Sequence, residues 1–450
     1  MSAPSRLPSL PDLFALAWPV VLARAAQSVV GFTDAVFVAP LGQDALAATG
    51  NGALNAFAAF MLPLGVAFIV QSFAAQLHGG GDRARLRRYG RYGLGLAALT
   101  EIAAVALLPV VPWLLAKADY TPAVRGLMGD YVAIRLLGVG AAVGMEALGN
   151  WFGGQGDTRV GFVASLLVMA VNVPLAWVFI HGGLGVPAMG VRGAAIASIL
   201  ATVAGFAYTL VAFARAGRGV AGEVGWRWGE FRRMLRFGLP NGVNWFLEFA
   251  AFLVFIDVVF AGMGTAPLAA LMAVLQLNSV VAMPAFGLSS AGAIHVGQAL
   301  GAGAHDAVPR LVRRTALVAC AWMGVASVAY ALTPRLLLGP FAPRGAEAAA
   351  FLAVGVPLLR VAVAWNLFDA AAMALSESLR AAGDTAWPMR ARIAVSWGLF
   401  VPLTVATARA GAGPVATLAW VVFYMAALTA LLAWRFRGGA WRAMELTGEA

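Results

Sequence analysis

The sequence predicts an all-α membrane protein whose twelve transmembrane helices form two parallel, pseudo-symmetric lobes of six helices each. Hydrophobic residues make up 61% of the 450 residues and charged residues only 11%, which is about half the charge of a soluble domain. The apolar residues fall in stretches long enough to cross a membrane, and the two halves of the chain resemble each other. Together these observations indicate lipid as the solvent and a duplicated chain.

The apolar stretches predict twelve spans, because a helix rising 1.5 Å per residue needs about 20 residues to cross the hydrocarbon. In the first half they cover residues 13–40, 45–77, 90–115, 127–153, 160–181 and 190–214. In the second half they cover residues 234–262, 267–300, 310–338, 351–380, 388–409 and 414–436. Many spans contain proline, which neighbouring helices can accommodate inside a membrane protein, so kinked helices are expected.

The placement of basic residues predicts the orientation. Twenty-two of the 31 Lys and Arg residues lie in the termini and in the loops that follow even-numbered spans, whereas six lie in the opposite loops. Because basic loops stay on the cytoplasmic side, both termini are expected in the cytoplasm of a multi-pass protein of the bacterial inner membrane. The net charge of +11 follows from this placement, so no nucleic-acid partner is expected.

The two halves repeat at an offset of about 221 to 227 residues. Pro19 matches Pro240, and the tripeptide Gly-Asp-Thr occurs both at 156–158 and at 383–385. Six spans per half is an even number, so both halves enter the membrane in the same orientation. We therefore expect an N-lobe at 1–214, a cytoplasmic linker at 215–233, a C-lobe at 234–450 and a substrate cleft between the lobes.

Residue patterns typical of enzymes are scarce. Cys320 is the only cysteine, so the chain has no disulfide framework and no thiol-based metal site. No HExxH or GxSxG-like pattern occurs, and the four histidines fall near predicted helix ends or in loops. An intramembrane enzyme is therefore disfavoured, and no cofactor is expected.

Acidic residues within the spans are candidate functional sites, because a charge at membrane depth is costly. Glu146 and Glu377 have basic residues nearby in sequence, Arg135 and Arg380, and structural ion pairs are expected for both. No such partner is evident in the sequence for Glu248, Asp369 or Asp34, so these three carboxylates are the candidates for a functional role.

Glu248 and Asp369 each lie within an apolar run without a basic neighbour on the same helix face. If their helices face each other, the two carboxylates can bind Na+ while ionised, or hold protons, and so form a cation switch. The alternative is two acids that are solvated separately in a cavity.

A second polar site could form in the first lobe from Asp34 and Asn172, where structural hydrogen bonding and function are equally good interpretations. Amides in membrane helices commonly form interhelical hydrogen bonds, but they can also line a cleft, and tryptophan can contact a cationic substrate. The candidate cleft residues are Gln27, Trp245, Gln276, Trp365 and Asn366.

The chain resembles the multidrug and toxic compound extrusion (MATE) family over nearly all of its length. Its first span, AWPVVLARAAQSVVGFTDAVFVAPLG, is similar to the opening span of that family, and MPAFGLSSAGAIHVGQALGAG is similar to the eighth span and following loop. The match is closest to the NorM-type branch: LPNGVNWFLE contains Glu248, and WNLFDAAAMALSESLRAAGDT contains Asp369. The resemblance implies that these two acids form the cation-coupling site.

Two departures from the family pattern bear on this assignment. Trp365 stands four residues before Asp369, where the family often has Tyr, and it keeps a π face for a cation but offers no hydroxyl ligand. Ala176 stands four residues after Asn172, where related members have Asp. The second lobe is therefore favoured over Asp34 as the coupling site.

The resemblance implies a secondary transporter that exports small organic cations in antiport with Na+ or H+ by alternating access. We expect it to act as a monomer in contact with membrane lipids. A lipid-linked saccharide flippase of the same superfamily is the runner-up, and clustering of Arg24, Arg135 and Arg360 in one cleft would favour it. A channel fits a duplicated pair of lobes less well than alternating access does.

Overall fold

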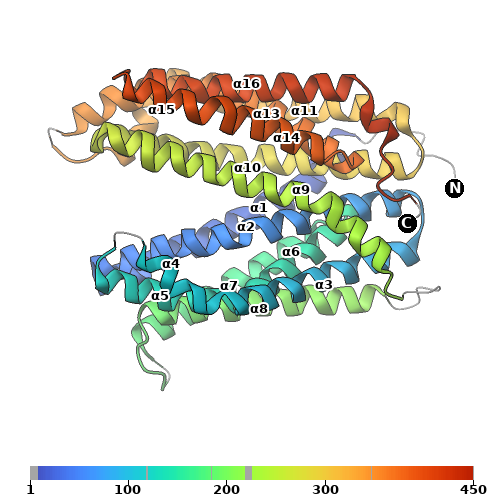
Figure 1. Cartoon of the computed structure of the whole chain (residues 1–450), viewed down its shortest axis with the longest axis horizontal. Helices are drawn as coiled ribbons and strands as arrows, with labels where there is room; N and C mark the ends of the chain where they lie inside the picture. Colours follow the sequence, from blue (N-terminus) through green and yellow to red (C-terminus); the bar gives the residue numbers. More distant parts are fainter. Residues whose placement is uncertain (1–8, 118–119, 184, 218–224, 346, 449–450) are drawn as a thin grey trace. The chain divides into compact units, whose positions relative to one another are not determined.

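The computed structural model describes residues 9–117, 120–183, 185–217, 225–345 and 347–448 (Figure 1). These residues form helices joined by short loops, with one isolated β-bridge between Gly183 and Val186. Eleven of their helices are long and apolar enough to cross a membrane, or up to twelve if one bent pair forms a single span. The predicted all-α membrane fold is confirmed.

The described residues divide into two compact units. The N-unit is Pro19–Gly242, and the C-unit comprises the described residues up to Trp18 together with Val243–Gly448. The unit boundaries fall inside helices α1 (Leu10–Val38) and α9 (Trp228–Leu253). Each unit therefore includes the start of the helix that leads into the other unit.

The helices follow the predicted spans closely. After α1, the first half contains α2 (Gln43–Gly79), α3 (Arg83–Leu107), α4 (Val111–Ala116), α5 (Pro122–Leu136), α6 (Val139–Gly154), α7 (Arg159–His181) and α8 (Val191–Ala216). After α9, the second half contains α10 (Thr265–Gly301), α11 (Val308–Leu332), α12 (Pro334–Leu338), α13 (Glu347–Ala382), α14 (Ala386–Val395), α15 (Val401–Arg409) and α16 (Pro414–Arg437). Residues 218–224 of the predicted linker lie outside the described residues.

The internal repeat extends to the backbone. Helices α2 and α10 each have 37 residues, and α3 and α11 each have 25. The residue before α2 is Gly42, with φ of 108°, and the residue before α10 is Gly264, with φ of 106°. Glycine alone adopts this conformation without strain, so the same turn chemistry starts the same long helix in both halves.

Some of the helices are bent or locally widened. The chain bends by 46° between α5 and α6, where the backbone N–H of Gly140 donates a 2.6 Å hydrogen bond to the carboxylate of Glu101 in α3. In the second half, α9 continues into a π-helical segment, Val254–Phe260, and another π-helical segment, Ser396–Phe400, joins α14 to α15. Such segments widen a helix locally and redirect the side chains that follow.

The core of the C-unit fixes the helices that carry the candidate coupling residues. The ring of Phe400 lies 5.2 Å from that of Phe255 and stacks on Tyr424 at 5.3 Å between centroids. All three side chains are almost fully buried. Because these residues come from α16 and from the two π-helical segments, the packing sets the positions of α9, α14 and α16 around one another.

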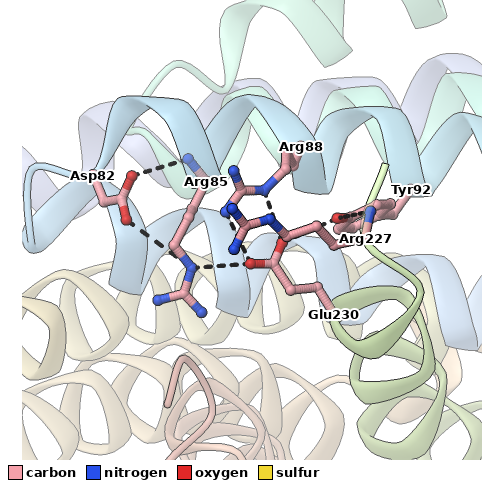
Figure 2. Close-up of polar contacts among 6 residues, drawn as sticks. All are labelled: Asp82, Arg85, Arg88, Tyr92, Arg227 and Glu230. Atoms are coloured by element: carbon pink, nitrogen blue, oxygen red, sulfur yellow. Dashed lines mark hydrogen bonds and ion pairs between the residues drawn. The ribbon is translucent and has the colours of Figure 1, made fainter. Parts of the chain in front are cut away.

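The start of α9 is tied to α3 within the N-unit (Figure 2). Arg88 donates two hydrogen bonds of 2.9 Å to the carboxylate of Glu230, and Tyr92 donates a third of 3.0 Å from its hydroxyl. Arg85 approaches the same carboxylate at 3.3 Å. The side chains of Arg88 and Glu230 are each only 6% exposed, so this bidentate pair is shielded from water and fixes the beginning of α9.

Close backbone packing continues this attachment further along α9. A Cβ atom on Gly242 would lie 2.4 Å from the carbonyl oxygen of Leu62, so only glycine fits there. The amide of Asn241 donates a 2.6 Å hydrogen bond to the carbonyl oxygen of Gly65 in α2. The first part of α9 is thus an integral part of the N-unit, while the part that carries Glu248 belongs to the C-unit.

Candidate cation-coupling site

Four helices of the C-unit bring charged and polar side chains together. Glu248 extends from α9, Asp369 from α13, Arg392 from α14 and Tyr424 from α16. The guanidinium of Arg392 forms an ion pair with the carboxylate of Glu248, and the Tyr424 hydroxyl lies beside the same guanidinium. We call these four residues the C-unit cluster.

Asp369 is the member of the C-unit cluster with no fixed partner among the described residues. Its side chain belongs to a residue that is only 9% exposed, and within the described chain it makes no hydrogen bond or ion pair of the kind that holds Glu248. Asp369 nevertheless lies within electrostatic range of both Glu248 and Arg392. The predicted proximity of the two acids is therefore present in the structure, although their roles remain a prediction.

Arg392 is the member that sequence reasoning missed. The count of basic residues places Arg392 with the cytoplasmic loop between the tenth and eleventh spans, and the sequence shows no basic neighbour on the helix face of Glu248. In the structure Arg392 pairs with Glu248 from another helix. The signal was available, because the predicted span 388–409 already contained Arg392. In the structure α14 starts at Ala386, so Arg392 lies on its second turn, where it reaches α9.

Trp365 and Asn366 lie near the C-unit cluster in sequence but point into the packed interior. Trp365 is 4% exposed, and its ring lies 6.3 Å from that of Phe252. Asn366 is fully buried and donates a 3.4 Å hydrogen bond to the hydroxyl of Ser327. Asn366 precedes Asp369 by one helical turn, so both residues share a face of α13.

The predicted N-lobe pair comes together through a residue that the sequence did not single out. The Ser198 hydroxyl donates a 3.1 Å hydrogen bond to the carboxylate of Asp34 and accepts a 3.3 Å hydrogen bond from the amide of Asn172. All three residues are buried. Arg135 lies within electrostatic range of Asp34. This N-unit cluster joins α1, α7 and α8, with Arg135 of α5 nearby.

The second acid of the N-unit has a different partner from the one predicted. Glu146 forms an ion pair of 3.2 Å with Arg24 of α1, not with Arg135. Arg135 and Glu146 are eleven residues apart, about 16 Å along a helix, which is too far for their side chains to pair. Arg135 instead lies within electrostatic range of Asp34 and 5.8 Å from the ring centre of Phe60. The predicted ion pair of Glu377 with Arg380 is confirmed.

The proposed cleft residues are divided between the two units. Gln27 lies in the N-unit, is exposed, and accepts a 3.1 Å hydrogen bond from Arg24. In the C-unit, Gln276 of α10 is exposed and Trp245 of α9 is half-buried. Trp365 and Asn366 are buried, as described above, so they could reach a substrate only after a rearrangement of neighbouring side chains.

The arginines that would support a flippase have separate surroundings. Arg24 is paired with Glu146, and Arg135 lies beside Asp34. Arg360 lies in the C-unit on an exposed face of α13. Within the N-unit, Arg24 and Arg135 therefore have different acidic neighbours.

The described residues contain no group of three or more His, Cys, Asp or Glu side chains that could hold a metal ion. A Na+ ion between Glu248 and Asp369 would therefore need amide, hydroxyl or backbone oxygens as additional ligands. Arg392 already occupies the carboxylate of Glu248. The cluster is consequently better suited to one cation beside Asp369 than to a closed cage of acidic ligands.

Comparison with known proteins agrees with this architecture. The family profile MatE matches residues 19–178 and 240–406. The chain is 29% identical over 426 residues to a probable multidrug resistance protein NorM of Rhizobium meliloti (strain 1021), covering 93% of this chain and 91% of the relative. A protein of the same description from Bradyrhizobium diazoefficiens is 29% identical over 438 residues, covering 94% and 92%.

Solved structures show the same fold. A crystal structure of a MATE in complex with MaL6 superposes with a TM-score of 0.86 at 18% identity, covering 96% of both chains. An outward-facing multidrug resistance MATE transporter of the MOP superfamily gives a TM-score of 0.84 at 19% identity, again over 96% of both chains. At this level of identity the likeness concerns the arrangement of the helices alone.

Proposed function

The chain belongs to the MatE family of membrane transporters, in its NorM-type branch, and from that premise we propose that it exports small organic cations in exchange for Na+ or H+. The transporter would work in the bacterial inner membrane as a monomer, with both termini in the cytoplasm. The relatives are described as probable multidrug resistance proteins, which supports a range of substrates over one specific solute.

One observation supports ion coupling above the others. Asp369 is a buried carboxylate without a fixed partner among the described residues, within electrostatic range of an ion pair formed by Glu248 and Arg392. A buried charge without a partner is costly in a membrane protein unless a cation neutralises it. The uptake and release of a cation at Asp369 would therefore change the relative stability of the conformations that the surrounding helices can adopt.

The cation would drive alternating access if the inward-facing and outward-facing conformations bind it with different affinities. A ligand shifts an equilibrium only by its differential affinity for the two states. One monovalent cation that enters down a potential of about 100 mV supplies about 2.3 kcal/mol. That energy sustains a concentration ratio of roughly fifty for a neutral substrate, since 1.4 kcal/mol corresponds to about a factor of ten.

A preference for cationic substrates rests on the charges within the spans. Asp34 and Asp369 are acids at membrane depth, and neither forms an ion pair among the described residues. A flippase for pyrophosphate-linked saccharides would instead need several basic residues facing one cavity. Arg24 is engaged with Glu146, which makes the flippase the weaker proposal.

The test is transport by the purified protein in proteoliposomes. A fluorescent organic cation is loaded, and its export is followed with a Na+ gradient alone, with a pH gradient alone and with neither. Ion-driven export of the cation, but not of an anionic dye of similar size, is expected. Export of the anionic dye at an equal or higher rate would contradict the proposed substrate class.

A further inference from the structure

Counting the charges of the C-unit cluster leaves one negative charge. Glu248 and Asp369 contribute two carboxylates, Arg392 contributes one guanidinium, and Tyr424 contributes a neutral hydroxyl. The cluster therefore carries one uncompensated negative charge when both acids are ionised. A structure with two free acids would instead require two cations.

Among the described residues, Arg392 is the one basic group that acts electrostatically on Asp369. Asp257 of the π-helical segment, Arg360 of α13 and Arg390 of α14 are all exposed. Glu377 and Arg380 of α13 pair with each other, and Arg435 of α16 pairs with Asp384, which lies between α13 and α14. Arg392 is the guanidinium that acts electrostatically on both Glu248 and Asp369.

Arg392 cannot readily leave the cluster for water. Its side chain is 13% exposed, whereas that of Glu248 is 32% exposed. A guanidinium stays protonated at all relevant pH values, and an enclosed charge that loses its partner is strongly destabilised. If the charge of Glu248 were removed, the nearest alternative carboxylate for Arg392 within electrostatic range is that of Asp369.

We infer that Arg392 is a built-in cation that neutralises one of the two carboxylates of the C-unit cluster, so that the transporter couples to a single monovalent cation, taken up at Asp369, in each cycle. This inference rests on the proposed antiport and adds its stoichiometry. Arg392 acts through Glu248 and Asp369, as a positioning residue, and does not itself contact the substrate.

The charge count gives a separate expectation for each charge-removing variant. Arg392→Gln leaves two carboxylates, so a second cation is taken up. Glu248→Gln leaves one carboxylate and one guanidinium, so Arg392 pairs with Asp369 and no cation is taken up. The double variant Glu248→Gln with Arg392→Gln leaves Asp369 alone, which restores the single negative charge of the native cluster.

The experiment measures the coupling ratio in proteoliposomes from the ion gradient that halts net transport of a fluorescent organic cation. Na+ and pH gradients are applied in separate arms, so that the coupling cation is identified in the same series. Expected ratios of ions to substrate are one for the native protein, two for Arg392→Gln, and one for the double variant, with no ion-driven transport for Glu248→Gln. Arg390→Gln, an exposed position two residues away, is the matched control and should keep the native ratio.

A second readout does not depend on transport. In detergent, the thermal unfolding midpoint is measured against the concentration of the coupling cation for each variant, with Arg392→Lys as the conservative replacement. The cation should stabilise the native protein, Arg392→Lys and the double variant to a similar extent, and it should not stabilise Glu248→Gln. This readout also shows whether each variant is folded.

The outcomes separate the inference from the proposed function. Suppose that the native protein couples to an ion, but the folded double variant behaves like Glu248→Gln, with neither ion-driven transport nor stabilisation by the cation. Arg392 then does not act by charge compensation, and only the inference is overturned. A native coupling ratio of two overturns it as well. If the native protein shows no ion-driven transport in either arm, both the antiport and the inference are wrong.

Discussion

The acids of the two units differ in how their charges are balanced. In the N-unit, Glu146 is paired with Arg24, and Asp34 accepts a hydrogen bond from Ser198 with Arg135 nearby. That arrangement contains two acids and two guanidiniums. The N-unit acids therefore have local compensation, which favours a structural role.

The C-unit contains the same kinds of residues in a different proportion. Gln27 of the N-unit and Glu248 of the C-unit are separated by the same offset as Pro19 and Pro240, and Glu146 and Asp369 are separated by a similar one. Arg392 is the one guanidinium within range of the two C-unit acids among the described residues. The comparison teaches that duplication preserved the backbone while the balance of charge diverged between the two units.

The largest expected effect separates the two aspartates. Asp369→Asn should reduce ion-driven efflux to background, at least about tenfold, because the amide keeps the size of the side chain but cannot carry the ion-dependent charge. Asp34→Asn should reduce it by no more than about threefold. Initial efflux rates in proteoliposomes, at matched protein incorporation, check this pair of variants. Normal coupling in Asp369→Asn together with lost coupling in Asp34→Asn would show that the switch lies in the N-unit and not in the C-unit.

Non-additivity of the C-unit acids provides a further check on the same comparison. Glu248→Gln should resemble Asp369→Asn, and the combination should be little worse than either single variant, as expected for residues that act as one unit. Efflux rates of the three variants, measured side by side, decide the matter. Two separately solvated acids would instead give effects that multiply.

An intermediate effect is expected for the ion pair of the N-unit. Arg24→Gln should lower stability by roughly 1 to 3 kcal/mol, because it leaves Glu146 without its partner in a partly enclosed site. The side chains are 27% and 18% exposed, so the loss should be smaller than for a fully buried pair. Thermal unfolding in detergent measures it. Adding Glu146→Gln should recover part of the stability, and a further loss would contradict a compensating pair.

The smallest effect is expected for Ser198→Ala. The substitution removes the hydroxyl that connects Asp34 to Asn172, and a hydrogen bond of this kind contributes about 1 kcal/mol. The unfolding midpoint should fall slightly while the ion-coupling ratio stays unchanged. A changed coupling ratio would show that the N-unit cluster takes part in coupling, and the contrast between the units would then be weaker than proposed.

Much of the fold could be predicted from the sequence, because the length of the apolar runs and repeat matches such as Pro19 with Pro240 can be read directly along the chain. The ion pairs were harder, because they depend on tertiary geometry. Arg135 and Glu146 are eleven residues apart, about three turns of helix, whereas Arg24 reaches Glu146 from another helix. Glu377 and Arg380 were predictable because a spacing of three residues brings side chains together on any helix.

The two acids of the C-unit cluster could be predicted from the sequence, but their basic partner could not, for a similar reason. Glu248 and Asp369 stood out as isolated acids in apolar runs, whereas Arg392 stood near a helix start and was counted with the loop. Its distance in sequence from Glu248 gives no hint of contact. Only the packing of α14 against α9 reveals the ion pair.

The crossing of α1 and α9 between the units has a consequence for how the protein can be taken apart. If the two halves were expressed as separate fragments cut in the linker between residues 215 and 227, the second fragment would carry the part of α9 that completes the N-unit, including Glu230 and Gly242. The first fragment would carry the segment up to Trp18 that completes the C-unit, where Leu13 and Ala17 are buried against Leu288 and Ala291. Neither fragment contains all of its own unit, so the two should accumulate in the membrane only when they are produced in the same cell.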